Sequence, residues 1–175
     1  RSLSVATPNT YVAGQTAPSP GITIVRGGVD VNADNVILQH LRVRPGDDLD
    51  APVDAIDNSE GSNLVVDHCS VSWGSDESLS TSAGGDNPNI TYTNNLIAEG
   101  LADSVHPKGV HSMGTLVNDL SQRVLLAGNL WANSIGRHPR LKGGTSTAVS
   151  NNLMYNFERG TNLGGGVTDE TTATI

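Results

Sequence analysis

The feature that most restricts the fold of this 175-residue chain is a short apolar segment that recurs five times along it. The five copies are NVILQHLRV (35–43), NLVVDHCSV (63–71), NITYTNNLI (89–97), RVLLAGNLW (123–131) and AVSNNLMYN (148–156). Aligned with one another, they make Leu41, Cys69, Asn95, Asn129 and Asn152 equivalent, at intervals of 28, 26, 34 and 23 residues. A short strand–kink–strand unit separated by insertions of variable length is typical of a solenoid.

The length of the repeat indicates which solenoid this is. Three strands of about four residues with three turns form one coil of a β-helix, and the next coil pairs with it ~4.8 Å away. The shortest interval, 23 residues, is long enough for one such coil. The 20 glycines and the aromatic content of only 3% favour short strands and tight turns, so helix should be scarce. The sequence therefore predicts an all-β fold, a right-handed parallel β-helix.

Three of the equivalent positions are asparagines, each followed by leucine: Asn95, Asn129 and Asn152. Asparagine is common in turns, which explains any one of them. Three in register favour a ladder, in which stacked amide side chains hydrogen-bond along the solenoid axis. We therefore expect these three side chains to stack at one corner.

The length of the chain suits one domain. We treat residues 1–175 as a single parallel β-helix domain. Solenoids normally have capped ends, and neither end of this sequence reads as a cap. We therefore expect the domain to lack one or both caps and to be part of a longer catalytic domain.

Charge and hydropathy exclude two classes of partner. The net charge of −8 and the pI near 4.8 argue against nucleic acid, because phosphate contacts need a basic surface. No apolar run approaches 18 residues, so we expect no membrane partner. The one cysteine, Cys69, lies in an apolar run and is expected to be a buried thiol.

Between the apolar copies lie the segments 53–60, 76–84, 108–117 and 139–147, each directly before its copy and therefore expected on one side of the solenoid. Charged residues recur in these segments or next to them, in the order Asp54, Asp76, Glu77, Lys108, Arg137 and Lys142. Carboxylates come first and cations later. If the coils stack, Asp54 and Arg137 are three coils, or about 15 Å, apart. A hard-cation site beside fixed positive charges suits an acidic sugar polymer.

Several segments resemble pectate lyases of polysaccharide lyase family 1: YVAGQTAPSPGITI (11–24), NVILQHLRVRPGD (35–47), NLVVDHCSVSWGSDESLS (63–80), HPKGVHSMGTLV (106–117) and GRHPRLKGG (136–144). The resemblance covers most of residues 11–156. It implies a parallel β-helix that cleaves de-esterified galacturonan by calcium-assisted β-elimination. The expected substrate is polygalacturonate or another pectic polysaccharide, and the expected protein is a secreted monomer.

The resemblance also implies roles for individual residues. Arg137 matches the catalytic base, and Lys108 matches the lysine that holds the substrate carboxylate. Asp54 and Asp76 match calcium ligands. Lys142 stands where the family usually has a second arginine. The positive charge is kept, but a lysine cannot bind a carboxylate through two N–H groups as an arginine does.

One departure concerns the calcium site. Ser80 stands where the family often has a second carboxylate, four residues after the equivalent of Asp76. A hydroxyl is a weaker calcium ligand than a carboxylate. The site is then weaker, is completed by Glu77 or Asp50, or is assembled only with substrate.

Other polar residues have two interpretations. Arg140 is a substrate contact or a surface ion-pair partner, and His106 and His111 line the groove or are solvated loop residues. Asp67 and His68 look like a catalytic pair, but their place in the repeat, away from Arg137, favours a structural role.

The two tryptophans also have two interpretations. Trp73 and Trp131 could stack on sugars. Trp131 lies in the strand register, which favours core packing.

Two other functions compete with the lyase. The first is a non-catalytic β-helix module that binds acidic polysaccharide or serves as a scaffold in a larger secreted protein. Such a module would have no reason to keep Arg137 with Lys108. The second is a lyase for esterified pectin, against which the acidic cluster argues.

Overall fold

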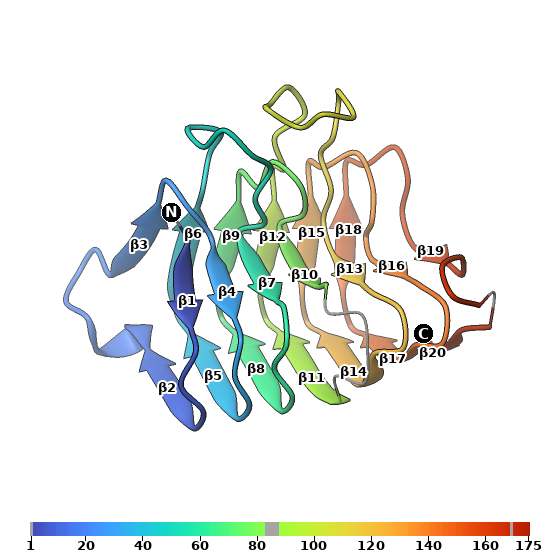
Figure 1. The fold of residues 1–175 in the computed structure, drawn as a ribbon, viewed down its shortest axis with the longest axis horizontal. Coiled ribbons are helices and arrows are strands. Elements are labelled where there is room, and N and C mark those ends of the chain that lie inside the picture. Colours follow the sequence, from blue (N-terminus) through green and yellow to red (C-terminus); the bar gives the residue numbers. More distant parts are fainter. Residues whose placement is uncertain (1, 83–87, 169) are drawn as a thin grey trace.

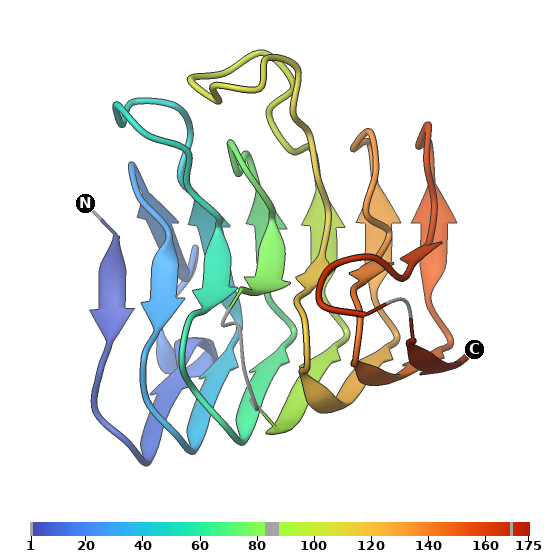
Figure 2. The same cartoon turned by 45° about the vertical axis from the view of Figure 1, so that its right-hand side comes forward.

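The fold is a parallel β-helix, seen in a computed structural model that describes residues 2–82, 88–168 and 170–175. Its strands alternate among three parallel sheets, so that each turn of the chain adds one strand to each sheet. Figures 1 and 2 show the coils following one another from the N-terminal to the C-terminal end. The all-β parallel β-helix predicted from the repeat is confirmed, and the described residues contain one short 3₁₀ helix, η1 (Gly14–Thr16).

The first sheet contains β1 (Leu3–Val5), β4 (Val29–Val31), β7 (Ile56–Asn58), β10 (Leu79–Thr81), β13 (Leu116–Val117), β16 (Arg140–Leu141) and β19 (Asn162–Leu163). The second sheet contains β2 (Thr10–Ala13), β5 (Val36–Gln39), β8 (Leu64–Asp67), β11 (Pro88–Thr93), β14 (Gln122–Ala127), β17 (Ser146–Ser150) and β20 (Thr172–Thr174). The third sheet contains β3 (Ile22–Val25), β6 (Leu41–Arg44), β9 (Ser70–Ser72), β12 (Leu96–Ala98), β15 (Leu130–Ala132) and β18 (Leu153–Tyr155).

The core is built from rows of apolar side chains that stack from coil to coil. Successive residues of a strand point to opposite faces, so every second side chain points into the solenoid. In the second sheet one inward row consists of Leu38, Val66, Tyr92, Leu126 and Val149, which are paired in register and buried. Trp131 is fully buried in the third sheet, and its indole N–H donates to Thr115 Oγ1 at 2.9 Å. Core packing of Trp131 is confirmed, as is the buried free thiol of Cys69.

The predicted asparagine ladder is present. Asn129 Oδ1 accepts from the Asn95 side-chain amide at 3.1 Å, and Asn129 Nδ2 donates to Asn152 Oδ1 at 3.0 Å. The Asn95 Oδ1 continues the ladder by accepting from the backbone N–H of Cys69. The hydrogen-bonded partners are 26, 34 and 23 residues apart, and Arg42 pairs with Ser70, 28 residues later. The four intervals inferred from the sequence are therefore confirmed.

A second asparagine ladder runs along an exposed corner and was not predicted. Its members, Asn9, Asn35, Asn63 and Asn89, are joined by side-chain hydrogen bonds of 2.6–3.0 Å. All four have φ between 55° and 64°, in the left-handed region that asparagine tolerates better than most residues. Each therefore closes the same sharp turn in successive coils.

Loops between the third and first sheets carry much of the candidate site. The segment 99–115, between β12 and β13, projects from the solenoid in both ribbon views (Figures 1 and 2). It falls within the 34-residue interval, the longest in the repeat. Residues 83 and 84 of the predicted segment 76–84 lie outside the described residues.

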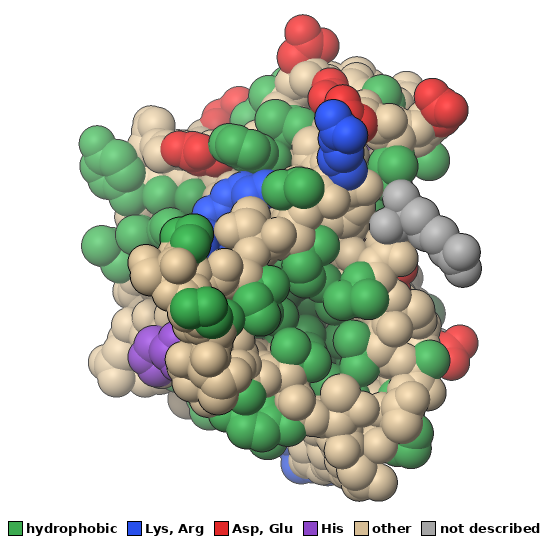
Figure 3. Space-filling model, turned by 90° about the vertical axis from the view of Figure 1, so that its left-hand side faces the viewer, with side chains coloured by type: hydrophobic (Ala, Val, Ile, Leu, Met, Phe, Trp, Pro, Cys, Tyr) green, Lys and Arg blue, Asp and Glu red, His purple; other side chains and the backbone are tan. Residues whose placement is uncertain are grey.

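The N-terminal end of the solenoid is apolar. Figure 3, which faces this end, shows hydrophobic side chains gathered across it. Leu3, Tyr11, Ile22 and Val25, from the three strands of the first coil, are all exposed there. Among the described residues, no helix is long and apolar enough to cross a membrane.

His138 is a buried histidine without a hydrogen-bond partner for either ring nitrogen among the described residues. Its ring packs edge-on against Phe157, with centroids 5.6 Å apart. Burial lowers the pKa of His138 from 6.5 to about 4. Between these values the unfolded chain binds a proton that the folded chain does not, so stability should fall as the pH is lowered through this window.

We expect His138→Leu to weaken this acid sensitivity, because leucine binds no proton. Chemical denaturation of the variant and the parent at a series of pH values from 7 to ~4 measures it. The stability of the variant relative to the parent should rise toward acid. A constant difference across the series would show that His138 titrates normally in the folded chain.

Candidate active site

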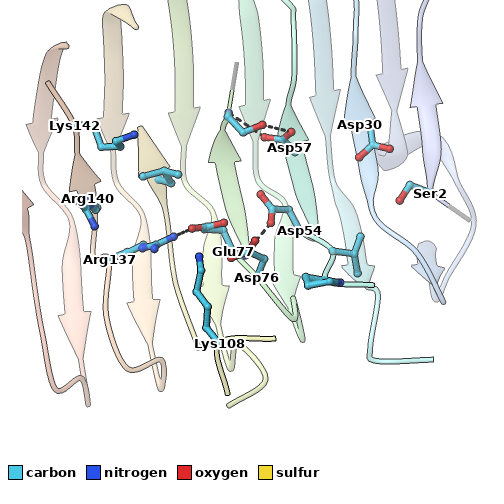
Figure 4. A pocket seen from close by; sticks show the side chains of 14 residues that line it. Ser2, Asp30, Asp54, Asp57, Asp76, Glu77, Lys108, Arg137, Arg140 and Lys142 are labelled. Carbon is cyan, nitrogen blue, oxygen red and sulfur yellow. Dashed lines mark hydrogen bonds and ion pairs between the residues drawn. The ribbon is translucent and has the colours of Figure 1, made fainter. Parts of the chain in front are cut away.

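A groove of about 630 Å³ runs along the first sheet and gathers most of the predicted site residues (Figure 4). Its lining includes seven of them: Asp54, Asp76, Glu77, Lys108, Arg137, Arg140 and Lys142. They come from successive coils, as the repeat predicted, with carboxylates in the earlier coils and cations in the later ones. The predicted gradient of charge along one side of the solenoid is therefore present.

A register row explains part of this arrangement. Asp30 on β4, Asp57 on β7 and Ser80 on β10 pair in register across the first sheet. Inward residues flank Asp57, since Ile56 and Asn58 are fully buried. The period of two therefore directs the Asp57 carboxylate outward, into the groove. Asp57 was missed from the sequence, although its position between two inward residues of a strand could have revealed it.

The carboxylates form a compact cluster. Oxygens of Asp54, Asp76 and Glu77 lie within 4.8 Å of one another. Burial, together with the charge of Asp57, raises the pKa of Asp54 well above its usual value. Both causes disfavour the charged form of Asp54, and a cation bound beside it would favour that form.

Ser80 lies inside this cluster and is fully buried. Its hydroxyl contacts Asp54 Oδ2 and lies 3.0 Å from Asp57 Oδ1. The Asp54 Oδ1 accepts the backbone N–H of Glu77 at 2.9 Å. These contacts hold the Asp54 carboxylate in place from both sides. Asp50, one of the residues considered for completing the cation site, does not line the groove.

Arg137 borders the carboxylates on the side of the later coils. Its guanidinium forms an ion pair with Glu77, and its side chain is 17% exposed (Figure 4). Burial lowers the pKa of Arg137, an effect that the charge of Asp76 opposes and that of Arg140 reinforces. Its φ of 59° lies in the left-handed region, as at several other turns of the solenoid.

The lysines occupy different environments. Lys108 is exposed and extends from the 99–115 loop toward the carboxylates (Figure 4). Lys142 forms an ion pair with Asp119 and donates to Asn118 Oδ1 at 2.8 Å. The charge of Lys142 is thus partly compensated locally, by a residue that the sequence did not single out.

The two histidines of the 99–115 loop are buried behind the groove and do not line it. His106 and His111 are 6% and 4% exposed, and their rings stack with centroids 3.9 Å apart. Both approach Asp76 Oδ1, at 3.5 Å and 2.8 Å. They are therefore not solvated loop residues, and they contact the cluster through one of its carboxylates.

Asp67 and His68 lie at the end of β8 in the second sheet, outside the groove that contains Arg137. Asp67 accepts hydrogen bonds from Gln39 and Thr93 in the neighbouring coils, at 2.7 and 2.9 Å. Hydrogen bonds, first among them that of His68, outweigh burial and lower the pKa of Asp67. These contacts join adjacent coils and agree with a structural role.

Trp73 is 45% exposed and lies outside the groove lining. The guanidinium of Arg44 stands 6.0 Å from the centre of its ring, and its indole N–H faces Glu99.

Fold and site together define a parallel β-helix whose first sheet carries a groove of buried and half-buried carboxylates beside arginine and lysine. Comparison with curated proteins gives a consistent result. The chain is 40% identical over 150 residues, or 85% of its length, to the "Probable pectate lyase C" of Aspergillus terreus and to that of Emericella nidulans. It is 29% identical over 143 residues to the "Probable pectin lyase B" of Aspergillus niger. No protein-family model matches the chain.

The resemblance to pectate lyases that the motifs indicated is confirmed by these relatives. The chain spans about a third of the length of the pectate lyases that it matches, 33% in each case. The similarity therefore concerns the matched third of those pectate lyases.

Proposed function

We propose that this chain carries the active-site groove of a calcium-assisted lyase that cleaves de-esterified galacturonan by β-elimination. The observation that supports the proposal most is the placement of Arg137 and Lys108 in one groove with Asp54 and Asp76. A module that only binds polysaccharide or serves as a scaffold would need cations on its surface. It would not need an arginine with a lowered pKa beside a carboxylate cluster. The relatives named pectate lyase support the same reaction class.

Calcium fits the donor set. The cluster offers carboxylate oxygens from Asp54, Asp76 and Glu77 within 4.8 Å of one another, and calcium prefers oxygen ligands. Glu77 is already paired with Arg137, so we propose Asp54 and Asp76 as the principal ligands. When bound, calcium would draw charge from the uronate carboxylate and make the C5 proton easier to remove.

In the proposed reaction the chain's own residues bind the substrate and move a proton. Lys108 pairs with the substrate carboxylate, and Arg140 and Lys142 extend the positive surface along the sugar chain. Neutral Arg137 takes the C5 proton, the electrons of that bond form the C4–C5 double bond, and the bond from C4 to the glycosidic oxygen breaks. The leaving oxygen takes a proton from solvent.

The substrate class implies where the protein acts. Pectic polysaccharide is an extracellular polymer, so we propose that the protein is secreted, and we expect it to act as a monomer. We propose no nucleic-acid partner, because the net charge of −8 opposes binding of a polyphosphate.

The test is the ultraviolet absorbance of the unsaturated product, measured with polygalacturonate in calcium and in excess chelator. We expect product only when calcium is present. Highly methyl-esterified pectin forms the second arm, because one relative is named pectin lyase. Turnover that persists in chelator would contradict the requirement for calcium. Faster cleavage of methyl-esterified pectin than of polygalacturonate would contradict the proposed substrate.

Ser80 offers a test of the cation site that does not depend on turnover. Ser80→Asp would add a carboxylate beside Asp54 and Asp57. Without calcium the added repulsion should lower the Tm by about 2–8 °C. With calcium the new ligand should make the calcium-induced rise in Tm larger than in the parent chain.

Differential scanning calorimetry in chelator and in calcium measures both effects. Ser80→Ala is the matched control, since it removes the same hydrogen bonds and adds no charge. A calcium-induced rise equal in Ser80→Asp and the parent would argue that no cation binds at this cluster.

A further inference from the structure

The buried pair His106 and His111 has no role in the reaction as proposed so far. The two rings are nearly parallel, 8° apart, and both direct Nε2 at the same oxygen of Asp76. His111 Nε2 is buried and makes no hydrogen bond of good geometry among the described residues. Both rings thus pack against the Asp76 carboxylate without lining the groove themselves.

His106 has a second contact through its other ring nitrogen. Its Nδ1 accepts a hydrogen bond from the backbone N–H of Lys108 at 3.1 Å. The backbone N–H of Gly109 donates to the His106 carbonyl at 3.0 Å, which closes the turn that presents Lys108. His106 is the buried residue in the otherwise exposed or half-buried stretch 102–110. The turn is therefore anchored through this ring.

The same contact decides between two uses of the histidines. The ligand atoms of Asp76, His106 and His111 lie within 4.8 Å of one another, close enough for a metal that prefers imidazole. A neutral imidazole that accepts at Nδ1 carries its proton at Nε2, which is the atom facing Asp76. Metal-bound histidine shows the opposite pattern, because its free nitrogen donates. The hydrogen bond at Nδ1 thus fits an imidazole that faces Asp76 with its Nε2–H, 3.5 Å away, better than it fits a metal ligand.

We propose that His106 is a positioning residue that couples the calcium-ligand carboxylate Asp76 to the substrate-binding cation Lys108, with His111 as a second support of Asp76. The inference rests on the proposed function for the roles of Asp76 and Lys108. One rigid ring contacts both groups, the Lys108 N–H at 3.1 Å and Asp76 Oδ1 at 3.5 Å, so a shift of the ring moves the carboxylate and the turn together. Asp76 lies just before β10 of the first sheet, whereas Lys108 lies on the projecting 99–115 loop between β12 and β13.

Two substitutions separate the halves of this link. His106→Asn keeps an acceptor near the position of Nδ1 and loses the contact with Asp76. It should raise the half-saturating calcium concentration about 10-fold, as loss of a residue that orients a metal ligand does, and reduce the calcium-induced rise in Tm.

His106→Gln keeps a donor near the position of Nε2 and loses the acceptor for Lys108. It should raise KM for polygalacturonate about 10-fold and leave the calcium-induced rise in Tm unchanged.

A double-mutant cycle tests the path through Lys108. If His106→Gln acts by misplacing Lys108, it should add less than about 2-fold in a Lys108→Ala background. Val110→Ala is the control, because Val110 is 69% exposed in the same loop, and it should change neither constant. Equal losses in His106→Asn and His106→Gln, without a division between calcium and substrate, would overturn the inference.

A spectroscopic measurement tests the link without turnover. The ¹⁵N chemical shifts of the His106 ring in the folded chain report which nitrogen carries the proton. We expect the proton on Nε2 and a free lone pair on Nδ1, and a proton on Nδ1 would overturn the link to Lys108. If the parent chain cleaves no substrate while these shifts are as expected, the proposed function fails and the link between Asp76 and the Lys108 turn stands.

Discussion

Replacing Arg137 with lysine should lower kcat on polygalacturonate by ~10²–10⁴, the range typical of a lost general base. Lysine keeps a charge at this position but places it differently, and it cannot reproduce the planar fork of arginine. Arg137 is held against Glu77, so even a small displacement moves the proton-accepting nitrogen away from C5. KM should change much less, because Lys108, Arg140 and Lys142 remain in the groove.

Steady-state kinetics at saturating calcium measures this prediction. Arg123→Lys is the control, since Arg123 is exposed on the second sheet and contacts Asn89. Lys108→Ala should behave differently, raising KM and lowering kcat together, because its contact with the substrate exists before and during the reaction. An Arg137→Lys variant that keeps most of the parental kcat would leave the binding module as the better interpretation.

The pH dependence of the parent adds a check on the base. Burial lowers the pKa of Arg137, yet the starting value of an arginine is so high that most of the guanidinium stays protonated near neutral pH. The fraction of neutral base, and hence the rate, should climb as the pH rises into the alkaline range. A rate that falls from neutral to alkaline pH, in chain that remains folded, would contradict an arginine base.

Removing the central member of the buried ladder should have the largest effect on stability. Asn129 is 2% exposed, accepts the backbone N–H of Asn95 at 3.0 Å and donates to the Tyr92 carbonyl at 2.8 Å. Asn129→Ala leaves both backbone groups buried without these partners, and each such group costs about 1–3 kcal/mol. We expect a loss of about 2–5 kcal/mol in the free energy of unfolding.

Urea denaturation measures this loss through the midpoint and slope of the transition. Asn32→Ala is the control, because the Asn32 side chain bonds Ser4 and the Asp30 carbonyl at a half-buried position, and it should lose less than about 1 kcal/mol. A midpoint for Asn129→Ala equal to that of the parent would mean that the ladder contributes nothing to stability.

Register in this fold could be predicted from the sequence because the coils repeat the same local pattern. The intervals between Cys69, Asn95, Asn129 and Asn152 follow from aligning short apolar runs, and the hydrogen bonds of the ladder join those residues. A strand has a period of two, so the alignment of one position fixes which neighbours point inward. The side of the solenoid that bears Asp54 and Arg137 followed from the same alignment.

The contacts within the groove could not be predicted in this way. His106 and Lys108 belong to an irregular loop, where no period determines which side chain is buried and which is exposed. The pairing of Lys142 with Asp119 depends on the path of the chain after β13, and spacing alone does not reveal that path.

The sequence by itself thus determined the class of fold, the succession of coils and the side on which charge gathers, because local strand periodicity and the repeat carry that information. Tertiary structure alone decided which charges meet: the contacts of Ser80 with Asp54 and Asp57, and the burial of the histidines behind Asp76. The physical reason is that these contacts join different coils and loops, and their geometry depends on how the loops pack against the sheet.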